Sequence, residues 1–260
     1  FIFHTDVETI LHGYEEWGDT VLERLDGMFA LALWDAPQQK LILARDRFGI
    51  KPLHYAILPH ALVFGSEIKA LLKHPDVPRT LDPHALWNFL TFAQIPAPDT
   101  IYQAIRKLLP GHALTSQTGH TSIRRFYNLP RKRPLHGPPE ELAIELRDRL
   151  DKAVQSHLNA DVPVGCFLSG GLDSSVITAL AARHHAGRLQ TFSVVFEDQP
   201  SVDESAFQKT VSEQYDTEHH VLPARTDLTA LVPDTLHATD EPYAISSFMP
   251  LYHLARMTRD

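Results

Sequence analysis

Residues 169–175 have the sequence Ser-Gly-Gly-Leu-Asp-Ser-Ser, and their types and spacing suit the binding of a phosphate group. They lie between an apolar run and a helix-like one, where unpaired backbone N–H groups and the helix dipole favour an anion. Gly170 and Gly171 let the backbone turn tightly and approach a phosphate closely, and three serine hydroxyls can add hydrogen bonds. The stretch therefore predicts a phosphate-binding loop.

Two other phosphate loops are excluded by the same residues. No Gly-Lys-Ser or Gly-Lys-Thr ends the loop, as it would in a Walker A sequence, and the glycines lack the G-x-G-x-x-G spacing of dinucleotide folds. These differences argue against γ-phosphoryl transfer and against hydride chemistry. The alternative without a ligand is a serine- and glycine-rich turn that only caps the following helix.

Strands and helices alternate around this loop. Strands are predicted at 162–168, 189–196 and 219–224. Helices are predicted from 138 to about 154, and at 174–185, 204–215 and 228–238. This alternation is typical of βαβ units and of a parallel sheet covered on both faces. Ligands of such sheets bind beyond the carboxyl ends of the strands, where the loop lies.

The first half of the chain has a different pattern. Helices are predicted at 6–17, 20–25 and 82–92, the first of them opened by a capping box at 5–8. Apolar or alternating runs at 28–35, 40–46 and 60–67 predict an antiparallel meander, and 109–129 predicts two more strands around a glycine turn. Prolines and charges cluster at 130–141, so we place a domain boundary near residue 130.

Composition limits the class of protein. The chain has 260 residues, 43% of them hydrophobic, which suffices for a substantial core in one or two domains. No run of eighteen apolar residues could span a bilayer, and 32 acidic against 24 basic side chains give no reason to expect nucleic acid or a membrane as partner. The single cysteine, Cys166, suits a buried residue in a reducing compartment, so we expect a cytoplasmic protein.

The S-G-G-L-D-S-S stretch after an apolar strand resembles the pyrophosphate loop of the N-type ATP pyrophosphatases, which cleave ATP to AMP and pyrophosphate while adenylating a carboxylate or carbonyl oxygen. Further motifs sharpen this to a resemblance to the glutamine-hydrolysing asparagine synthases. Upstream these motifs are LDGMFALALWD, LILARDRFGIKPLHYA and FGSEIKALL; downstream they are TFSVVF, DES at 203–205, TEHH at 217–220 and DEP at 240–242. Their order matches that of the family from about Thr5 to about Arg256.

The resemblance implies the fold class and the domains. It implies an α+β N-terminal part, a partial Ntn-type glutaminase with antiparallel sheets, followed by an α/β Rossmann-like parallel sheet of the PP-loop ATP pyrophosphatase type. Residues 1–130 would be the C-terminal part of a type 2 glutamine amidotransferase domain, and 131–260 the N-terminal part of the ATP-dependent asparagine synthetase domain. The ligands implied are ATP, Mg²⁺, aspartate, and glutamine or ammonia. Many members of the family are dimers, so the resemblance also implies a homodimer.

Seven residues take ATP-binding positions by this resemblance: Phe167, Ser169, Gly170, Gly171, Asp173, Ser174 and Val194. A carboxylate beside bound phosphates would repel them without a divalent cation, so Asp173 is assigned to Mg²⁺, with the N-cap of the following helix as its alternative role. Phe167 stands where the family usually has Leu, whose backbone contacts the adenine, and Val194 matches its partner contact. The change is tolerated if that contact uses main-chain groups, and it alters the pocket if the side chain packs on the base.

Asp6 matches the family aspartate that binds the α-amino group of glutamine, as a carboxylate can; its alternative is a first-turn residue stabilised by the helix dipole. Asp240, Glu241 and Ser246 lie where the family lines the aspartate and acyl-adenylate pocket, with structural polar residues as the alternative. The family's nucleophile is an N-terminal cysteine that this chain lacks and Cys166 cannot replace, so no catalytic residue is assigned.

The leading hypothesis is an asparagine synthase that converts ATP, aspartate and glutamine to asparagine, AMP, pyrophosphate and glutamate through β-aspartyl-AMP. The family's downstream S-G-x-G-x-D-E loop is missing, so we expect a fragment cut at both ends and inactive alone. One alternative is a relative with the same domains that amidates another carboxylate. The other is a non-catalytic relic that binds a nucleotide or nothing.

Overall fold

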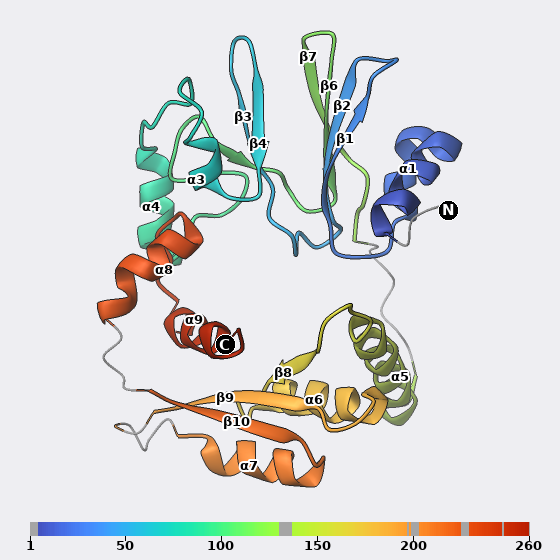
Figure 1. Ribbon diagram of the computed structural model, residues 1–260, viewed down its shortest axis with the longest axis vertical. Helices are drawn as coiled ribbons and strands as arrows, with labels where there is room; N and C mark the ends of the chain where they lie inside the picture. The colour runs from blue at the N-terminus through green and yellow to red at the C-terminus, as the bar shows by residue number, and fades with distance from the viewer. Residues whose placement is uncertain are drawn as a thin grey trace. The chain divides into compact units, whose positions relative to one another are not determined.

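The computed structural model describes residues 5–129, 137–196, 198, 203–224, 229–245 and 247–259 (Figure 1). The chain divides into two compact units. The first comprises Phe1–Arg131 and Leu236–Ala244, and the second comprises Lys132–Thr235 and Ile245–Asp260. The short segment 236–244 therefore belongs to the first unit although both of its flanks belong to the second.

Four antiparallel strands form the larger sheet of the first unit, in the order β1-β2-β6-β7. These strands are β1 (Ala30–Asp35), β2 (Lys40–Arg45), β6 (His112–Gln117) and β7 (His120–Arg125). Leu33 of β1 is paired with Ile42 of β2 and both are buried, whereas Trp34 is on the opposite face and exposed. This alternation is the period of two that predicted the strands. Thr118 and Gly119 join β6 to β7, both with positive φ, as in a type I′ turn.

The smaller sheet of the first unit shows that the predicted meander is wrong in its third strand. Its antiparallel strands lie in the order β4-β3-β5 and are β3 (His54–Ile57), β4 (Leu62–Gly65) and β5 (Arg106–Lys107). The run at 60–67 forms β4, which pairs with β3 and not with β2. Sequence reasoning missed β3 because it has only four residues and directly follows a turn-rich stretch.

The three helices predicted in the first unit lie close to their predicted positions, and two further short helices there were not predicted. They are α1 (Asp6–Trp17), η1 (Gly18–Thr20), α2 (Val21–Arg24), α3 (Ile68–Leu71) and α4 (Pro83–Phe92). The α1 bounds agree with the prediction, but Thr5 makes no side-chain capping bond, so the predicted capping box is not formed. In α4 the cap is present, because Asp82 accepts a hydrogen bond of 2.9 Å from the His84 backbone N–H.

Two apolar clusters hold the sheets of this unit together. One joins α2 to the larger sheet, and Ile10 and Tyr14 of α1 pack against it; its buried residues are Val21, Leu22, Leu33, Ile42, Ala44, Ala113 and Phe126. The other joins the two sheets through Leu43, Leu53, Tyr55, Leu108 and Leu114. Burial of these side chains removes apolar surface from water, which is the main stabilising contribution to such a core.

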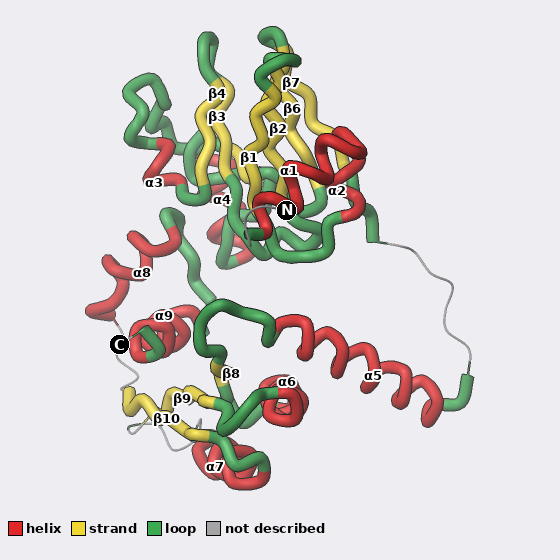
Figure 2. Tube along the Cα trace, turned by 45° about the vertical axis from the view of Figure 1, so that its right-hand side comes forward, coloured by secondary structure: helices red, strands yellow, loops and turns green. Residues whose placement is uncertain are grey.

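The second unit contains the predicted parallel sheet, with strand order β10-β9-β8. The strands are β8 (Gly165–Phe167), β9 (Gln190–Phe196) and β10 (Glu218–Ala224). The helices from residue 139 onward are α5 (Pro139–His157), α6 (Leu172–His184), α7 (Ser205–Gln214), η3 (Thr229–Leu231), α8 (Val232–Thr239) and α9 (Phe248–Met257). Figures 1 and 2 show α7 and α9 on opposite sides of the sheet, as expected for a sheet covered on both faces.

A cluster of four buried residues, Val154, Leu180, Ala181 and Leu189, packs α5 against α6 and the sheet. The half-buried Cys166 lies beside this cluster, in β8. Among the described residues no helix combines the length and apolar character that crossing a membrane requires.

Candidate functional site

The predicted phosphate loop joins the carboxyl end of β8 to the start of α6, and its serines bond to one another. The Ser169 and Ser174 hydroxyl oxygens are 2.9 Å apart, and the Ser169 backbone N–H donates to Ser174 Oγ at 3.2 Å. Ser174 and Ser175 hydroxyls both donate to the Gly171 carbonyl, at 3.1 and 2.7 Å. These bonds close the loop into a compact turn and leave the first-turn N–H groups of α6 directed outward.

Gly170 and Gly171 have different roles in this turn. Gly170 has φ +86°, and a Cβ there would lie 3.0 Å from Phe207 Cβ and 3.1 Å from the Glu204 carbonyl oxygen. Gly171 has φ −70° and ψ 167°, and a Cβ there would meet only Ser169 Oγ, at 3.3 Å. Gly170 is therefore required by the backbone conformation and by the close approach of α7, whereas Gly171 keeps the outer side of the turn free of a side chain.

Asp173 lies in the first turn of α6 and its side chain is exposed. The N-cap of this helix is Gly171, so the alternative that Asp173 is the N-cap is wrong. The helix begins two residues earlier than predicted, because Leu172 and Asp173 already adopt helical conformation. An acidic residue at this position interacts favourably with the helix dipole and also stands beside the N–H groups that could hold an anion.

Phe167 and Val194 lie at the same edge of the parallel sheet. Phe167 is the last residue of β8 and is paired with Phe192, two residues before Val194 on β9. Val194 therefore lies beyond the end of β8, where the Leu168 carbonyl accepts a hydrogen bond from the Ser193 hydroxyl. The Phe167 side chain is 45% exposed at this edge.

Gln208 is a part of the loop region that sequence reasoning did not find. Its side chain is 3% exposed, and Nε2 lies 3.4 Å from both the Ser169 and the Val194 carbonyl oxygens. Within the described part of the chain, Gln208 Oε1 is buried without a hydrogen-bond partner. Gln208 lies on α7, far along the chain from the loop, so no local motif in the sequence connects it to the loop.

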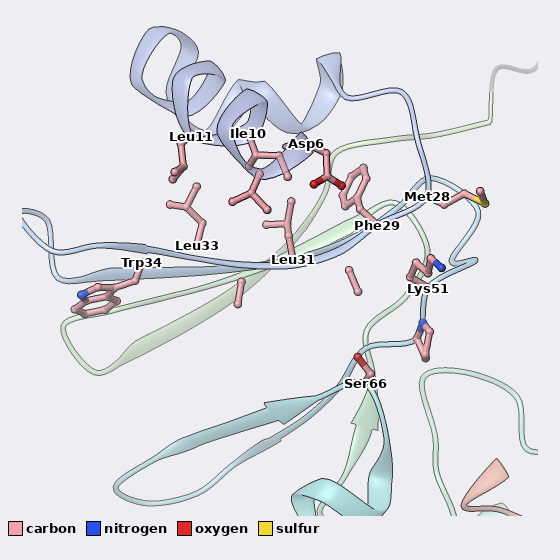
Figure 3. A pocket seen from close by; sticks show the side chains of 14 residues that line it. Asp6, Ile10, Leu11, Met28, Phe29, Leu31, Leu33, Trp34, Lys51 and Ser66 are labelled. Atoms are coloured by element: carbon pink, nitrogen blue, oxygen red, sulfur yellow. The ribbon is translucent and has the colours of Figure 1, made fainter. Parts of the chain in front are cut away.

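Asp6 lines a cavity of about 530 Å³ in the first unit (Figure 3). Side chains of α1, including Ile10 and Leu11, face Leu31 and Leu33 of β1 across it. Among the described residues, the charged members of its lining are one carboxylate, Asp6, and one ammonium group, Lys51. The cavity thus combines apolar walls with one charge of each sign, which suits a small zwitterionic ligand.

The loop that carries Lys51 is held by two charged side chains of the ARDRFGIKP stretch, the buried Asp46 and the partly buried Arg45. Asp46 is 1% exposed and accepts hydrogen bonds of 3.0 Å from the backbone N–H groups of Phe48, Ile50 and Lys51. Burial alone would raise the pKa of Asp46, but these N–H groups outweigh it and hold the pKa below its usual value.

Arg45 completes the loop by donating to the carbonyls of Lys51, Leu108 and Gly49 at 2.7 to 2.8 Å. The bonds from Arg45 and Asp46 together fix the whole turn 46–51, and with it the position of Lys51 at the cavity. Sequence reasoning noted this stretch as a motif without identifying the role of either residue.

The predicted pocket carboxylates Asp240 and Glu241 are paired with lysines of the first unit. Asp240 Oδ1 lies 3.0 Å from Lys69 Nζ, and Glu241 Oε2 lies 2.6 Å from Lys107 Nζ. Ser246, predicted with them, lies outside the described residues. Neither carboxylate is near the loop residues in sequence, and both have satisfied partners.

The remaining candidates give no metal or thiol site. Burial raises the pKa of the Cys166 thiol, which disfavours the reactive thiolate. No group of three or more His, Cys, Asp or Glu side chains with metal-binding geometry occurs in the ranges that the structure describes.

Comparison with known proteins defines the class. The family model "Glutamine amidotransferase domain" matches residues 1–127, and the model "Asparagine synthase" matches residues 145–260. The chain thus combines a glutamine amidotransferase region, containing Asp6 and its cavity, with an asparagine synthase region, containing the serine and glycine loop.

Individual relatives agree with both models. Asparagine synthetase (glutamine-hydrolyzing) 3 of Bacillus subtilis is 36% identical over 230 residues, which cover 83% of this chain and 37% of the relative. A putative asparagine synthetase (glutamine-hydrolyzing) of Mycobacterium tuberculosis H37Rv is 35% identical over 262 residues, covering 98% and 40%. Amidase chyE of Penicillium rubens is 30% identical over 243 residues, covering 85% and 35%.

The chain belongs to the family of glutamine-hydrolysing asparagine synthetases. It spans 35% to 40% of the length of these three curated relatives.

Proposed function

We propose that the protein makes asparagine from aspartate, ATP and glutamine, and that the loop at 169–174 holds the pyrophosphate part of ATP. The observation that carries the proposal is the turn itself. Two glycines and three bonded serines place the first-turn N–H groups of a 13-residue helix at the carboxyl edge of a parallel sheet. An anion is stabilised at such a helix end by hydrogen bonds and by the dipole.

The chemistry follows from the poor reactivity of a carboxylate. An oxygen of the aspartate side-chain carboxylate attacks the α-phosphorus of ATP, the bond between that phosphorus and the bridging oxygen breaks, and pyrophosphate leaves. Ammonia then attacks the acyl carbon, AMP leaves with the former carboxylate oxygen, and a proton is lost to give the amide. In this scheme the loop amides stabilise the charge that develops on the departing pyrophosphate.

The residues at the loop fit a magnesium ion held mainly by the substrate. Mg²⁺ usually keeps several waters and binds through one or two carboxylates together with substrate phosphates. The exposed Asp173 carboxylate supplies one such ligand beside the expected phosphate position. When bound, the ion neutralises phosphate charge. Without it, Asp173 would repel the anion that the helix end attracts.

We further assign the adenine contacts to the main chain at Phe167 and Val194. Phe167 ends β8 and Val194 lies on β9 past that end, so backbone groups are available there for a planar base. The buried Gln208 amide, bridging the Ser169 and Val194 carbonyls, would hold this edge at a fixed distance from the loop. The exposed Phe167 ring leaves room for the family's usual Leu to be replaced.

In the first half of the chain we assign Asp6 to the α-amino group of glutamine. Its carboxylate lines the apolar cavity and can pair with an ammonium group. By this proposal residues 1–130 are the C-terminal part of a type 2 glutamine amidotransferase domain that supplies ammonia, and 131–260 are the N-terminal part of the synthetase domain. The same proposal makes the enzyme a cytoplasmic homodimer.

Release of AMP and pyrophosphate tests the proposal. With ATP, aspartate and ammonia, the intact enzyme that contains this chain is expected to release both products, and Asp173→Ala in that enzyme is expected to abolish release. Asp161→Ala removes another exposed carboxylate, at the amino-terminal side of β8, and is expected to have no effect. Equal turnover of Asp173→Ala and the unmodified protein would contradict the assignment.

A second candidate function is amidation of a carboxylate other than aspartate. One of the relatives is named an amidase and not an asparagine synthetase, which is the reason for considering another substrate. A panel of carboxylic acids, each assayed for AMP release, separates the two functions. Aspartate giving the highest kcat/KM supports the first proposal, and another acid giving it supports the second. No AMP with any carboxylate would leave the non-catalytic alternative.

A further inference from the structure

Asp240 and Glu241 are adjacent in the chain, and the carboxylate of each forms an ion pair with a lysine. Asp240 pairs with Lys69 of α3, which also lies 3.0 Å from Glu67, and Glu241 pairs with Lys107 of β5. All these residues belong to the first unit, since 236–244 is part of it. The pairs are partly buried: the side chains of Asp240, Glu241 and Lys107 are 8%, 11% and 17% exposed.

The position of Glu241 is set by more than one bond. Its Oε1 accepts a hydrogen bond of 2.8 Å from the Ile101 backbone N–H, and its Oε2 binds Lys107. Lys107 also donates to the Ile95 carbonyl at 2.8 Å. Thr100, buried beside Ile101, donates to the Ile105 carbonyl at 2.9 Å, so the stretch 95–107 is fixed by its own bonds. The lysine and the N–H group therefore form a site whose geometry does not depend on Glu241.

The backbone of the segment also suits its position. Asp240 directly follows α8 with φ +63°, and its N–H donates to the Leu236 carbonyl at 2.9 Å. A left-handed residue at this point ends the helix and turns the chain, and Asp tolerates it better than most residues. Four residues later, the Ala244 N–H donates to the Ala93 carbonyl at 2.9 Å, just past the end of α4. The segment is thus held at both ends.

Carboxylates as buried as these are stable only when paired, and each of the two is paired with a lysine. Glu241, which accepts from a lysine and a backbone N–H, has little capacity left for a substrate. This separates the pair from Asp173, whose carboxylate is exposed at the loop. The family resemblance placed Asp240 and Glu241 near the aspartate pocket, and their contacts favour the alternative of structural polar residues.

We propose that Asp240 and Glu241 are a docking element, an acidic dipeptide that occupies a basic site of the first unit formed by Lys69, Lys107 and the Ile101 N–H. The site fits two adjacent carboxylates because it offers two ammonium groups and a backbone donor. This docking element anchors the segment 236–244 in the first unit, although the stretches before and after this segment belong to the second unit.

Charge reversal and charge exchange test this element in the 260-residue chain, read by amide hydrogen exchange at Ala244. Glu241→Lys or Lys107→Glu is expected to speed exchange at Ala244 on the order of tenfold or more, because each places like charges together. The double variant Lys107→Glu with Glu241→Lys is expected to restore most of the protection. Glu213→Lys breaks the exposed Lys209–Glu213 pair of α7 and is expected to leave Ala244 unchanged.

The amide of Leu43, in the centre of the larger sheet, reports whether the first unit stays folded. If a charge-reversal variant also loses protection at the Leu43 amide, Glu241→Gln is used in its place. This change keeps the side-chain shape and removes only the charge. Its expected result is faster exchange at Ala244 while Leu43 stays protected. Unchanged exchange at Ala244 in the folded single variants, or a double variant as fast as the singles, would overturn the proposal.

Aspartate itself separates docking from substrate binding. Under the proposal, saturating aspartate leaves exchange at Ala244 unchanged. Protection of Ala244 by aspartate that Glu241→Gln abolishes would return the pair to a substrate site. These readouts do not require turnover, so absence of AMP formation would refute the proposed function and leave the docking element standing.

Discussion

Three glycine-to-alanine substitutions in the second unit separate backbone strain from steric conflict at the loop. Gly170 has φ +86° and contacts α7 closely, Gly187 has φ +93° with open space around it, and Gly171 has an ordinary φ of −70°. Gly187→Ala therefore adds strain alone and Gly170→Ala adds strain and overlap. Gly171→Ala adds no backbone strain and one tight contact, 3.3 Å from Ser169 Oγ, which a small shift of that side chain relieves.

The expected losses of unfolding free energy follow from these contacts. A left-handed conformation costs Ala about 1–2 kcal/mol, which is the whole effect at Gly187. At Gly170 a Cβ 3.0 to 3.2 Å from Phe207 Cβ, the Glu204 carbonyl and the Gln208 nitrogen adds about 1–3 kcal/mol of overpacking, giving about 2–5 kcal/mol. Gly171→Ala changes the free energy of unfolding by less than about 1 kcal/mol, since the unfolded chain loses entropy as well.

The single cysteine provides the assay. Cys166 lies in the second unit and is half-buried, so the rate at which a thiol reagent labels it under native conditions reports opening of that unit. We expect labelling to accelerate in the order Gly171→Ala, Gly187→Ala, Gly170→Ala. Equal rates for Gly170→Ala and Gly187→Ala would refute the role of the α7 contacts. The effect of Gly171→Ala on ATP binding does not follow its small effect on stability. This substitution places a methyl group on the outer side of the loop, so it is expected to weaken ATP binding while the second unit stays folded.

Two further predictions concern the first unit, which contains all three tryptophans, so their fluorescence follows its unfolding. Asp46→Asn retains one carboxamide oxygen but turns an NH₂ group toward a backbone N–H. Urea unfolding is therefore expected to show a loss of about 2–4 kcal/mol in the free energy of unfolding, against almost none for Asp26→Asn, which changes an exposed carboxylate. Equal unfolding midpoints for the two variants would contradict this prediction. Burial lowers the pKa of His54 to about 4, so the unfolded chain takes up a proton below pH 6.5 that the folded chain does not. The stability contributed by neutral His54 is present above pH 6.5 and falls by about 2 kcal/mol on going to pH 5, a loss that His54→Gln is expected to remove; an unaltered pH dependence in that variant would exclude His54 as its source.

Local sequence was sufficient to predict the loop and the parallel sheet around it. The turn at Ser169–Ser174 is built from bonds between residues at most five positions apart, and β8, α6 and β9 follow directly in the chain. Hydrophobic periodicity and turn residues carry this kind of information. The helix start moved by two residues, which is within the usual uncertainty of a boundary, and this shift excludes the alternative of Asp173 as N-cap and makes it a first-turn residue.

What could not be predicted depends on contacts between distant residues. The Glu241 carboxylate and the Ile101 N–H are 140 positions apart, and Gln208 reaches Ser169 across 39. No periodicity encodes such pairs. The strand β3 was missed for a related reason, because its four residues gain their strand conformation by pairing with β4 and β5. The run at 60–67 was predicted as a strand, but its own sequence does not show which strand it pairs with.

Transfer of oxygen from aspartate to AMP tests the central claim most directly. Aspartate labelled with ¹⁸O in its side-chain carboxylate is incubated with the intact enzyme that contains this chain, ATP, Mg²⁺ and ammonia, and the AMP is analysed by mass spectrometry. Because the carboxylate oxygen becomes the bridge in β-aspartyl-AMP and leaves with the phosphate, labelled AMP is expected, with release of pyrophosphate. Unlabelled AMP, or ADP with inorganic phosphate, would contradict adenylation of aspartate at this loop.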